Sequence, residues 1–339
     1  MARLRVALLS SAHVHAAGWL AGLRQRAEVA VPGVADEDEA RGRAFATEHG
    51  LTWFDSYEAL LAEAPDAVVI NSENTRHGEL VELAAGAGAH ILCEKPLATT
   101  AAEARRMLRC CEAAGVMLMT AFPMRFSPPV IAAREALRAG NLGRVYGCNA
   151  ANQGQLPAQV PWFIDPQLAG GGALMDHVVH VADLLRWFFG SEVREVYALG
   201  NRILHQELEP QVETGGVVLL DFEDGSFASI DCSWSRPPQY PTWGNVKLEI
   251  VAERGLLTLD AFRQASTVYR RGTPGPQLAY WGSDANQGLI DEFVNAILEG
   301  RSPAISGHDG VQASAIAEAA LQSARSGEAL RHQNEMDAP

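Results

Sequence analysis

The chain has 339 residues, of which 47% are hydrophobic, and its 41 acidic residues outnumber its 27 basic ones to give a formal net charge of -14. A chain of this length is long for one hydrophobic core, so we expect two domains. The acidic balance excludes nucleic acid as an expected partner, and the lack of a long apolar run speaks against a membrane span. No charged-then-apolar leader precedes Arg3, and the five cysteines lack C-x-x-C spacing, so a cytoplasmic location is expected.

The N-terminal part, roughly the first 120 residues, alternates short apolar runs with helical patterns, which indicates β-α-β units and a parallel sheet. The predicted strands cover residues 4–9, 29–35, 67–71, 90–93 and 116–120. The predicted helices cover residues 36–49, 56–63, 77–86 and 100–114. Together these elements predict a Rossmann-like domain over residues 1–122.

The pattern changes after Pro123. A helix is expected near residues 130–139 and a strand over 143–150, followed by two hairpins, at 217–234 and 246–262, each with a glycine-containing turn. Helices over residues 287–298 and 311–325 close the pattern, and the polar tail after Arg331 is expected to fray. The second domain, residues 123–330, is therefore predicted to be α+β with antiparallel strands.

The turn after the first strand lies in the stretch LLSSAHVHAAGWL, residues 8–20. A dinucleotide-binding domain normally carries G-x-G-x-x-G at this place, but no glycine precedes Gly18. Asp36 follows the second predicted strand, where a carboxylate would bind the ribose 2'-OH of NAD and repel the 2'-phosphate of NADP. The alternative is that Asp36 only caps the next helix.

Lys95 is one of only two lysines, the other being Lys247. It lies in ILCEKPLATT, directly after an apolar strand, at the sheet edge where α/β proteins bind ligands. An ammonium group there can stabilise negative charge that develops on a substrate oxygen. The alternative is an ordinary surface lysine in a turn.

The stretch GGGALMDHVVHVADLLRWFFG, residues 170–190, predicts a buried helix after three glycines that permit close backbone approach. Asp176 and His180 are spaced i and i+4, and Asp183 continues a similar stripe. We expect an acid/base pair in which the carboxylate orients the imidazole and favours its protonated form. Core packing and a metal site are the alternatives, but no metal-helix motif matches, so no metal ligand is assigned.

These segments resemble the Gfo/Idh/MocA family (glucose-fructose oxidoreductase, inositol dehydrogenase and rhizopine catabolism). The resemblance is carried by EKP at 94–96, the 170–190 helix, NSENTRH at 71–77 and SARSG at 323–327. It implies an N-terminal Rossmann domain and a C-terminal α+β domain with a large, open, mainly antiparallel sheet. It also implies hydride transfer between NAD(P) and a small sugar-like molecule, and assembly into dimers or tetramers.

The resemblance also implies roles for individual residues. The catalytic positions map onto Lys95, Asp176 and His180. The cofactor contacts map onto Ser10, Ser11, Ala12, His13, His15, Asp36, Ser72, Asn74, His77, Glu94, Lys95 and Arg125, with Trp162 beside the nicotinamide or substrate. Family members carry glycine where this chain has Ser10, Ala12 and His15. Backbone N–H groups can still hold a pyrophosphate there, provided that the turn avoids positive φ.

Three functions remain open at this point. The first is an NAD-dependent dehydrogenase acting on the CH–OH group of a sugar, a polyol such as inositol, or a sugar acid. The second, suggested by the glycine-free turn, is a cofactor-binding regulatory protein without turnover. The third is a metal-dependent hydrolase, because His13-Val14-His15 imitates the H-x-H pair of amidohydrolase barrels, a fold that would need eight β-α units.

Overall fold

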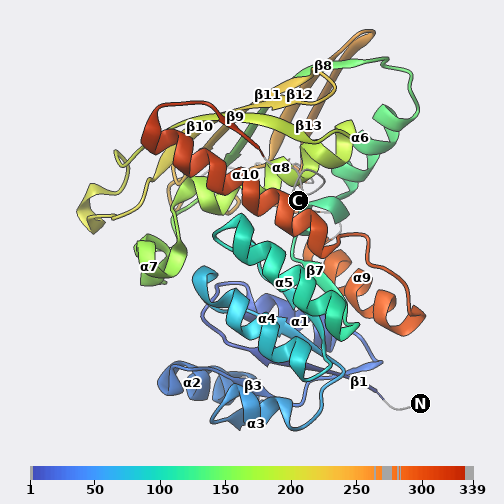
Figure 1. The fold of residues 1–339 in the computed structure, drawn as a ribbon, viewed down its shortest axis with the longest axis vertical. Helices are drawn as coiled ribbons and strands as arrows, with labels where there is room; N and C mark the ends of the chain where they lie inside the picture. The colour runs from blue at the N-terminus through green and yellow to red at the C-terminus, as the bar shows by residue number, and fades with distance from the viewer. Residues whose placement is uncertain (1–2, 263–264, 269–276, 281, 283, 333–339) are drawn as a thin grey trace.

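The computed structural model describes residues 3–262, 265–268, 277–280, 282 and 284–332. Two large sheets organise this part of the chain (Figure 1). The N-terminal sheet and its helices form the lower half of the view, and the C-terminal sheet extends along the top. The predicted tail beyond His332 lies outside the described residues.

The N-terminal sheet has the order β4-β3-β1-β5-β6-β7, with β2 beside β1, and its strand pairs are parallel. Its strands are β1 (Leu4–Leu9), β2 (Val29–Ala30), β3 (Val34–Ala35), β4 (Trp53–Phe54), β5 (Ala67–Ile70), β6 (His90–Cys93) and β7 (Leu118–Thr120). Its helices are α1 (Ala16–Arg24), α2 (Glu39–His49), α3 (Tyr57–Leu61), α4 (His77–Gly86) and α5 (Ala101–Ala114), with a 3-10 turn η1 (Asn74–Arg76). The predicted Rossmann-like sheet is confirmed.

The predicted strand over residues 29–35 is split into β2 and β3, which pair with the two ends of β1. Pro32 between them has no N–H for a ladder, and a side chain at Gly33 would collide with the Thr52 carbonyl oxygen, 2.4 Å from an ideal Cβ. The helix expected from residue 36 begins only at Glu39. Its N-cap is Asp38, whose side chain accepts from the Arg41 N–H at 3.0 Å, so the interpretation of Asp36 as the cap is wrong.

The C-terminal sheet has the order β13-β12-β8-β11-β10-β9-β16. Its strands are β8 (Val145–Gln153), β9 (Val193–Asn201), β10 (Gly215–Phe222), β11 (Phe227–Ser233), β12 (Lys247–Ala252), β13 (Gly255–Asp260) and β16 (Leu330–Arg331); β14 (Ala265–Val268) pairs with β15 (Gln277–Tyr280) separately. Both predicted hairpins are present as β10–β11 and β12–β13. Only β8 and β11 run parallel among these described strands, so the sheet is mainly antiparallel, as expected.

Helices cover one face of this sheet and join the two halves. They are α6 (Pro128–Arg138), α7 (Pro166–Ala169), α8 (Ala173–Phe189), α9 (Ala285–Glu299) and α10 (Gly307–Ser326), with 3-10 turns η2 (Pro123–Phe126), η3 (Pro161–Ile164) and η4 (Gln206–Leu208). Helix α10 packs on α8 and β9 on one side and on α5 and β7 on the other, and it runs between the halves in Figure 1. The long helix α8 thus lies between the C-terminal sheet and α10.

The alternation of the strands leaves the other face of the C-terminal sheet uncovered in this chain. Leu199 and Val217 are cross-strand neighbours on that face and are 58% and 45% exposed. Two open sheets are incompatible with an eight-fold β-α barrel, so the amidohydrolase interpretation is wrong. Within the described residues, no helix has the length and apolar character needed to span a bilayer.

Candidate functional site

The first turn, between β1 and α1, uses a positive φ without glycine. Ser10 has φ 68°, so the expectation that the turn avoids positive φ is wrong. Asp36 holds this turn, because the Ser11 N–H and hydroxyl donate to its Oδ2 at 2.7 and 2.8 Å and the Ser10 hydroxyl donates at 3.3 Å. The Ser10 oxygen in turn accepts from the Ala12 N–H at 3.2 Å. Side-chain hydrogen bonds therefore stabilise a backbone shape that glycine would adopt without them.

Asp36 is buried and is also paired with Arg41, whose Nη2 lies 2.6 Å from its Oδ1. Burial raises the pKa of Asp36, but the hydrogen bonds and charge of Arg41, with those from Ser11, lower it below its usual value. Arg41 also reaches Glu73, with Nη1 3.0 Å from Oε1. The two carboxylates and one guanidinium leave a negative balance at the position expected for the adenosine ribose. The sequence placed Arg41 five residues away but did not indicate that it pairs with Asp36.

The segment after β5 connects the loops at the same sheet edge. Asn74 donates to the Ala169 carbonyl at 3.0 Å, and the His77 ring lies between the Pro96 and Ser72 carbonyls at 2.9 and 3.3 Å. Ser72 is buried and donates to the Glu73 carbonyl at 3.3 Å. Ser72, Asn74 and His77 therefore lie where they were expected, and their contacts with a cofactor stay predictions.

Several buried oxygen atoms in this segment have no hydrogen-bond partner among the described residues. They are Asn71 Oδ1, Glu73 Oε2 and Asn74 Oδ1. Buried polar atoms are normally paired, so unpaired acceptors at one sheet edge indicate a place for a polar molecule. The hydroxyl and amide donors of NAD fit such acceptors, and the donors of the first turn fit its pyrophosphate.

Glu94 and Lys95 follow β6 and point into different networks. Glu94 Oε1 accepts from Trp19 Nε1 at 2.5 Å, and His15 Nδ1 and His13 Nδ1 lie 2.9 and 3.6 Å from the same oxygen. Burial alone would raise the pKa of Glu94, but the two histidines lower it. Burial lowers the pKa of His13 to about 3, so its ring is neutral near pH 7. Both H-x-H side chains thus converge on Glu94.

Lys95 is paired with Asp176 of α8. Its ammonium contacts Asp176 Oδ1 and lies 3.3 Å from the Asp176 backbone oxygen. Asp176 Oδ2 accepts from Trp234 Nε1 at 2.9 Å and lies 3.1 Å from His177 Nε2. Burial alone would raise the pKa of Asp176, but the charges of Lys95 and His177 hold it well below its usual range. This carboxylate is therefore ionised and fully engaged.

His180 is not bonded to Asp176 in the way that the i, i+4 spacing suggested. Its Nδ1 is buried without a hydrogen-bond partner among the described residues. Burial and the charge of Lys95 lower its pKa well below 6.5, and the opposite effect of Asp176 is smaller. The expected protonated imidazole is therefore wrong, because Lys95 has already neutralised the carboxylate. A neutral imidazole with an unused nitrogen is a proton acceptor.

Asp183 and Arg125 form a separate buried network. Arg125 Nε donates to Asp183 Oδ2 at 2.8 Å, and its Nη2 contacts Asp309 Oδ1 at 2.9 Å. Burial raises the pKa of Asp183 to about 6 despite the opposing charge of Arg125. Asp183 thus lies outside the Lys95 cluster, and the expected cofactor contact of Arg125 stays a prediction.

Three residues that the sequence did not single out position the site. Trp234 bonds Asp176, the Asn152 carbonyl lies 2.7 Å from His177 Nδ1, and Glu213 Oε1 accepts from the Gly172 and Leu174 N–H groups at the start of α8. An ideal Cβ on Gly172 would lie 1.8 Å from the Glu213 carbonyl oxygen, which confirms the close approach expected at these glycines. Trp162, which was expected here, donates to the Ala12 carbonyl at 3.1 Å and stacks on Phe163.

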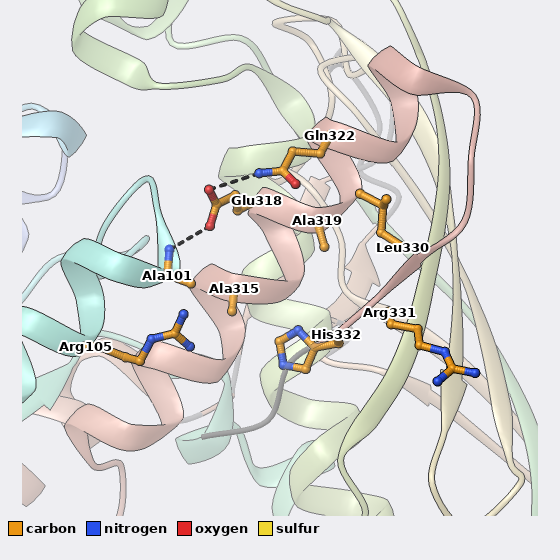
Figure 2. Close-up of a pocket in the computed structure, with 9 residues that line it drawn as sticks. All are labelled: Ala101, Arg105, Ala315, Glu318, Ala319, Gln322, Leu330, Arg331 and His332. Carbon is orange, nitrogen blue, oxygen red and sulfur yellow. Dashed lines mark hydrogen bonds between the residues drawn. The ribbon is translucent and has the colours of Figure 1, made fainter. Parts of the chain in front are cut away.

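A separate cavity of about 320 Å³ lies between α5, α10 and β16 (Figure 2). Glu318 in its wall accepts from the Ala101 N–H at 2.7 Å and from Gln322 at 3.1 Å. None of the predicted catalytic or cofactor residues lines it. The candidate site is therefore the sheet edge at Glu94 and Lys95.

The fold and this edge together define a two-domain oxidoreductase. Residues 10–122 match the model described as "Oxidoreductase family, NAD-binding Rossmann fold", and residues 130–258 match the GFO/IDH/MocA C-terminal domain. The chain belongs to the Gfo/Idh/MocA oxidoreductase family, as the sequence motifs predicted. The predicted boundary between residues 122 and 123 stays a prediction.

Characterised relatives include dehydrogenases. The chain is 32% identical over 310 residues to D-xylose 1-dehydrogenase (NADP(+)) 2 of Haloferax volcanii, covering 90% of this chain and 93% of that protein. It is 28% identical over 300 residues to myo-inositol 2-dehydrogenase of Thermotoga maritima, covering 86% and 87%. Among solved structures, GenD2 from gentamicin A biosynthesis in complex with NAD is 26% identical, with a TM-score of 0.89 over 98% of this chain and 97% of that one. The predicted enzyme class, a dehydrogenase acting on CH–OH, is confirmed.

Proposed function

We propose that the chain transfers hydride between NAD and a CH–OH carbon of a sugar, polyol or sugar acid. The observation that carries the proposal is the unpaired, buried Nδ1 of His180 beside the engaged Lys95–Asp176 pair. A neutral proton acceptor and a fixed ammonium group at one sheet edge are what alcohol oxidation requires. The named dehydrogenases among the relatives support the same substrate class.

The residues take distinct roles in the oxidative direction. His180 accepts the hydroxyl proton, and the Lys95 ammonium stabilises the negative charge that develops on the substrate oxygen. Asp176 is a positioning residue, because its carboxylate holds the ammonium in place. When bound, NAD supplies the hydride acceptor. Ser10 to His15, Asp36 and Glu94 would hold it, with Trp162 over the first turn.

We further propose that NAD is preferred over NADP. Asp36, Glu73 and Arg41 form a cluster in which one of the two negative charges is not neutralised. A 2'-phosphate placed there would meet net repulsion, whereas a 2'-OH could donate to a carboxylate. The NADP-dependent name of the Haloferax volcanii relative makes this preference a property to be measured on this chain.

The substrate is best sought in an assay of NAD reduction across polyols, aldoses, sugar acids and amino sugars, with NAD binding measured by calorimetry. We expect micromolar to millimolar NAD binding and NADH formation with at least one class. NAD binding without turnover across the panel would favour the regulatory alternative. No NAD binding would contradict both.

We also propose self-association, as a dimer or tetramer, through the uncovered face of the C-terminal sheet. Leu219 on β10 and Phe227 on β11 are 49% and 64% exposed on that sheet. An apolar patch of this kind usually marks an interface. Light scattering should give a mass above that of one chain, and Phe227→Lys should reduce it. A monomer at micromolar concentration would contradict the proposal.

A further inference from the structure

His13, His15 and Glu94 lie close together although 79 positions separate His15 from Glu94. One possible ligand atom from each residue lies within 4.8 Å of the others. His15 Nδ1 and His13 Nδ1 lie 2.9 and 3.6 Å from Glu94 Oε1. In a tetrahedral zinc site, with bonds of about 2.0–2.2 Å, neighbouring ligand atoms are about 3.3 Å apart. These separations therefore match a zinc site after shifts of a few tenths of an ångström.

The charge at this place is incomplete. Glu94 is buried, and among the described residues its ion-pair partners are these two histidines. The neighbouring ammonium of Lys95 is engaged by Asp176. A buried carboxylate is stable when a cation or a set of hydrogen bonds compensates it. A divalent ion between the three side chains would supply that charge.

Two further contacts are suited to a metal site. Trp19 Nε1 donates to Glu94 Oε1 at 2.5 Å and the Lys95 N–H donates to Oε2 at 3.1 Å, so the carboxylate is held in one orientation, as outer partners hold metal ligands. His13 is 3% exposed, and its Nε2 is buried without a hydrogen-bond partner among the described residues. The first turn thus contains a buried imidazole with an unused polar atom.

We propose that His13, His15 and Glu94 bind a divalent transition metal ion, zinc by the chemistry of the donors. Two histidines and one glutamate form a ligand set that catalytic zinc sites use, with the fourth position left for water or a small ligand. The sequence offered only the H-x-H pair, because nothing in the spacing indicated that Glu94 would meet it. The proposal goes beyond hydride transfer and does not depend on it.

The test uses untagged full-length protein, loaded with Zn²⁺, dialysed and analysed for metal content. About one zinc per chain should remain, and Co²⁺ in its place should give the strong visible absorption of a tetrahedral site. His15→Ala and His13→Asn should each weaken Zn²⁺ binding by at least about tenfold. His49→Ala, a histidine at the end of α2, is the matched control and should bind zinc normally.

Circular dichroism identifies any variant that does not fold. Because His15 is partly exposed, its replacement is the variant expected to keep the fold. Loss of zinc from folded His15→Ala, with retention in His49→Ala, would establish the site. The proposal is overturned if the wild-type chain retains no zinc, or if folded His15→Ala and His13→Asn retain as much as wild type. Both measurements are made without substrate or NAD, so failure of the dehydrogenase proposal would be seen separately.

Discussion

Glu94 and Lys95 are adjacent at the end of β6, yet their side chains enter different halves of the molecule. Lys95 crosses to α8 and meets Asp176, a full opposite charge. Glu94 remains with the β1–α1 turn and meets Trp19 and two histidines. The first arrangement fixes a cation near a proton acceptor, and the second fixes the shape of the turn expected to hold the cofactor. Substitutions on the Lys95 side should therefore alter turnover, and substitutions on the turn side should alter cofactor binding.

The largest effect is expected from Lys95→Met. Loss of the ammonium should lower kcat by roughly 10²-fold or more, because an electrostatic donor to developing charge is typically worth ~3 kcal/mol. The NAD dissociation constant should change by no more than a few-fold, since Lys95 points toward α8. Lys247→Met removes the other lysine, half-exposed on β12, and is the control that should keep wild-type turnover. Equal turnover in both variants would contradict the role of Lys95.

Lys95→Met should also affect stability. It leaves the Asp176 carboxylate buried without its cation, which typically costs about 3–5 kcal/mol of the free energy of unfolding. Denaturant titration should therefore show a lower midpoint than for wild type, and the activity assay should be run well below the unfolding temperature. An unchanged midpoint would mean that the pair is weaker than its burial indicates.

His180→Asn should reduce kcat to a similar extent and remove a protonation step from the pH profile, because a base must be deprotonated to act. Asp176→Asn should move the acidic limb of that profile to lower pH. The negative charge of Asp176 raises the pKa of His180, so its neutralisation lowers that pKa further and leaves the imidazole neutral to a lower pH. A profile of kcat against pH that is unchanged in His180→Asn would assign the proton transfer to another group.

On the turn side, Ala12→Leu should weaken NAD binding by about tenfold or more, which corresponds to ~1.4 kcal/mol. Ala12 is buried beneath Trp162, so a larger side chain would displace the backbone that is expected to approach the pyrophosphate. Calorimetry gives the dissociation constant. Ala17→Leu, at an exposed position of α1, should bind NAD normally. Normal binding by Ala12→Leu would exclude this turn as the phosphate site.

A smaller change is expected from Asp36→Ala, which should narrow the preference for NAD over NADP by several-fold. The variant removes a carboxylate beside the ribose position and leaves Arg41 free to face a 2'-phosphate. Asp38→Ala removes the cap of α2 and should leave the ratio of the two dissociation constants unchanged. A ratio near one in the wild-type protein would contradict the proposed preference.

The smallest effect is expected from Ser10→Gly. Glycine adopts the positive φ at this position without strain, but the hydrogen bonds of the Ser10 hydroxyl are lost. The two contributions are each of order 1 kcal/mol and opposite in sign, so melting temperature and NAD affinity should both stay near wild type. A large loss of NAD affinity would mean that the hydroxyl itself is needed for binding.

The sequence predicted the two-domain fold, the hairpins and the sheet edge at Lys95 because these depend on local periodicity and turn residues. It missed the pairing of Lys95 with Asp176, because side chains 81 positions apart leave no local signal. Helical spacing placed Asp176 and His180 on one face correctly but could not reveal that Lys95 takes the carboxylate. The convergence of His13 and His15 on Glu94 was missed for the same reason.

The central claim is direct hydride transfer at the Lys95–His180 edge, and isotope labelling tests it. A substrate from the panel, deuterated at the reacting carbon, would be oxidised with NAD, and the reduced cofactor analysed by mass spectrometry. The account predicts one deuterium in each reduced nicotinamide ring, and a rate that falls by roughly 10²-fold in Lys95→Met but not in Lys247→Met. Reduced cofactor without deuterium, or equal rates in the two variants, would contradict it.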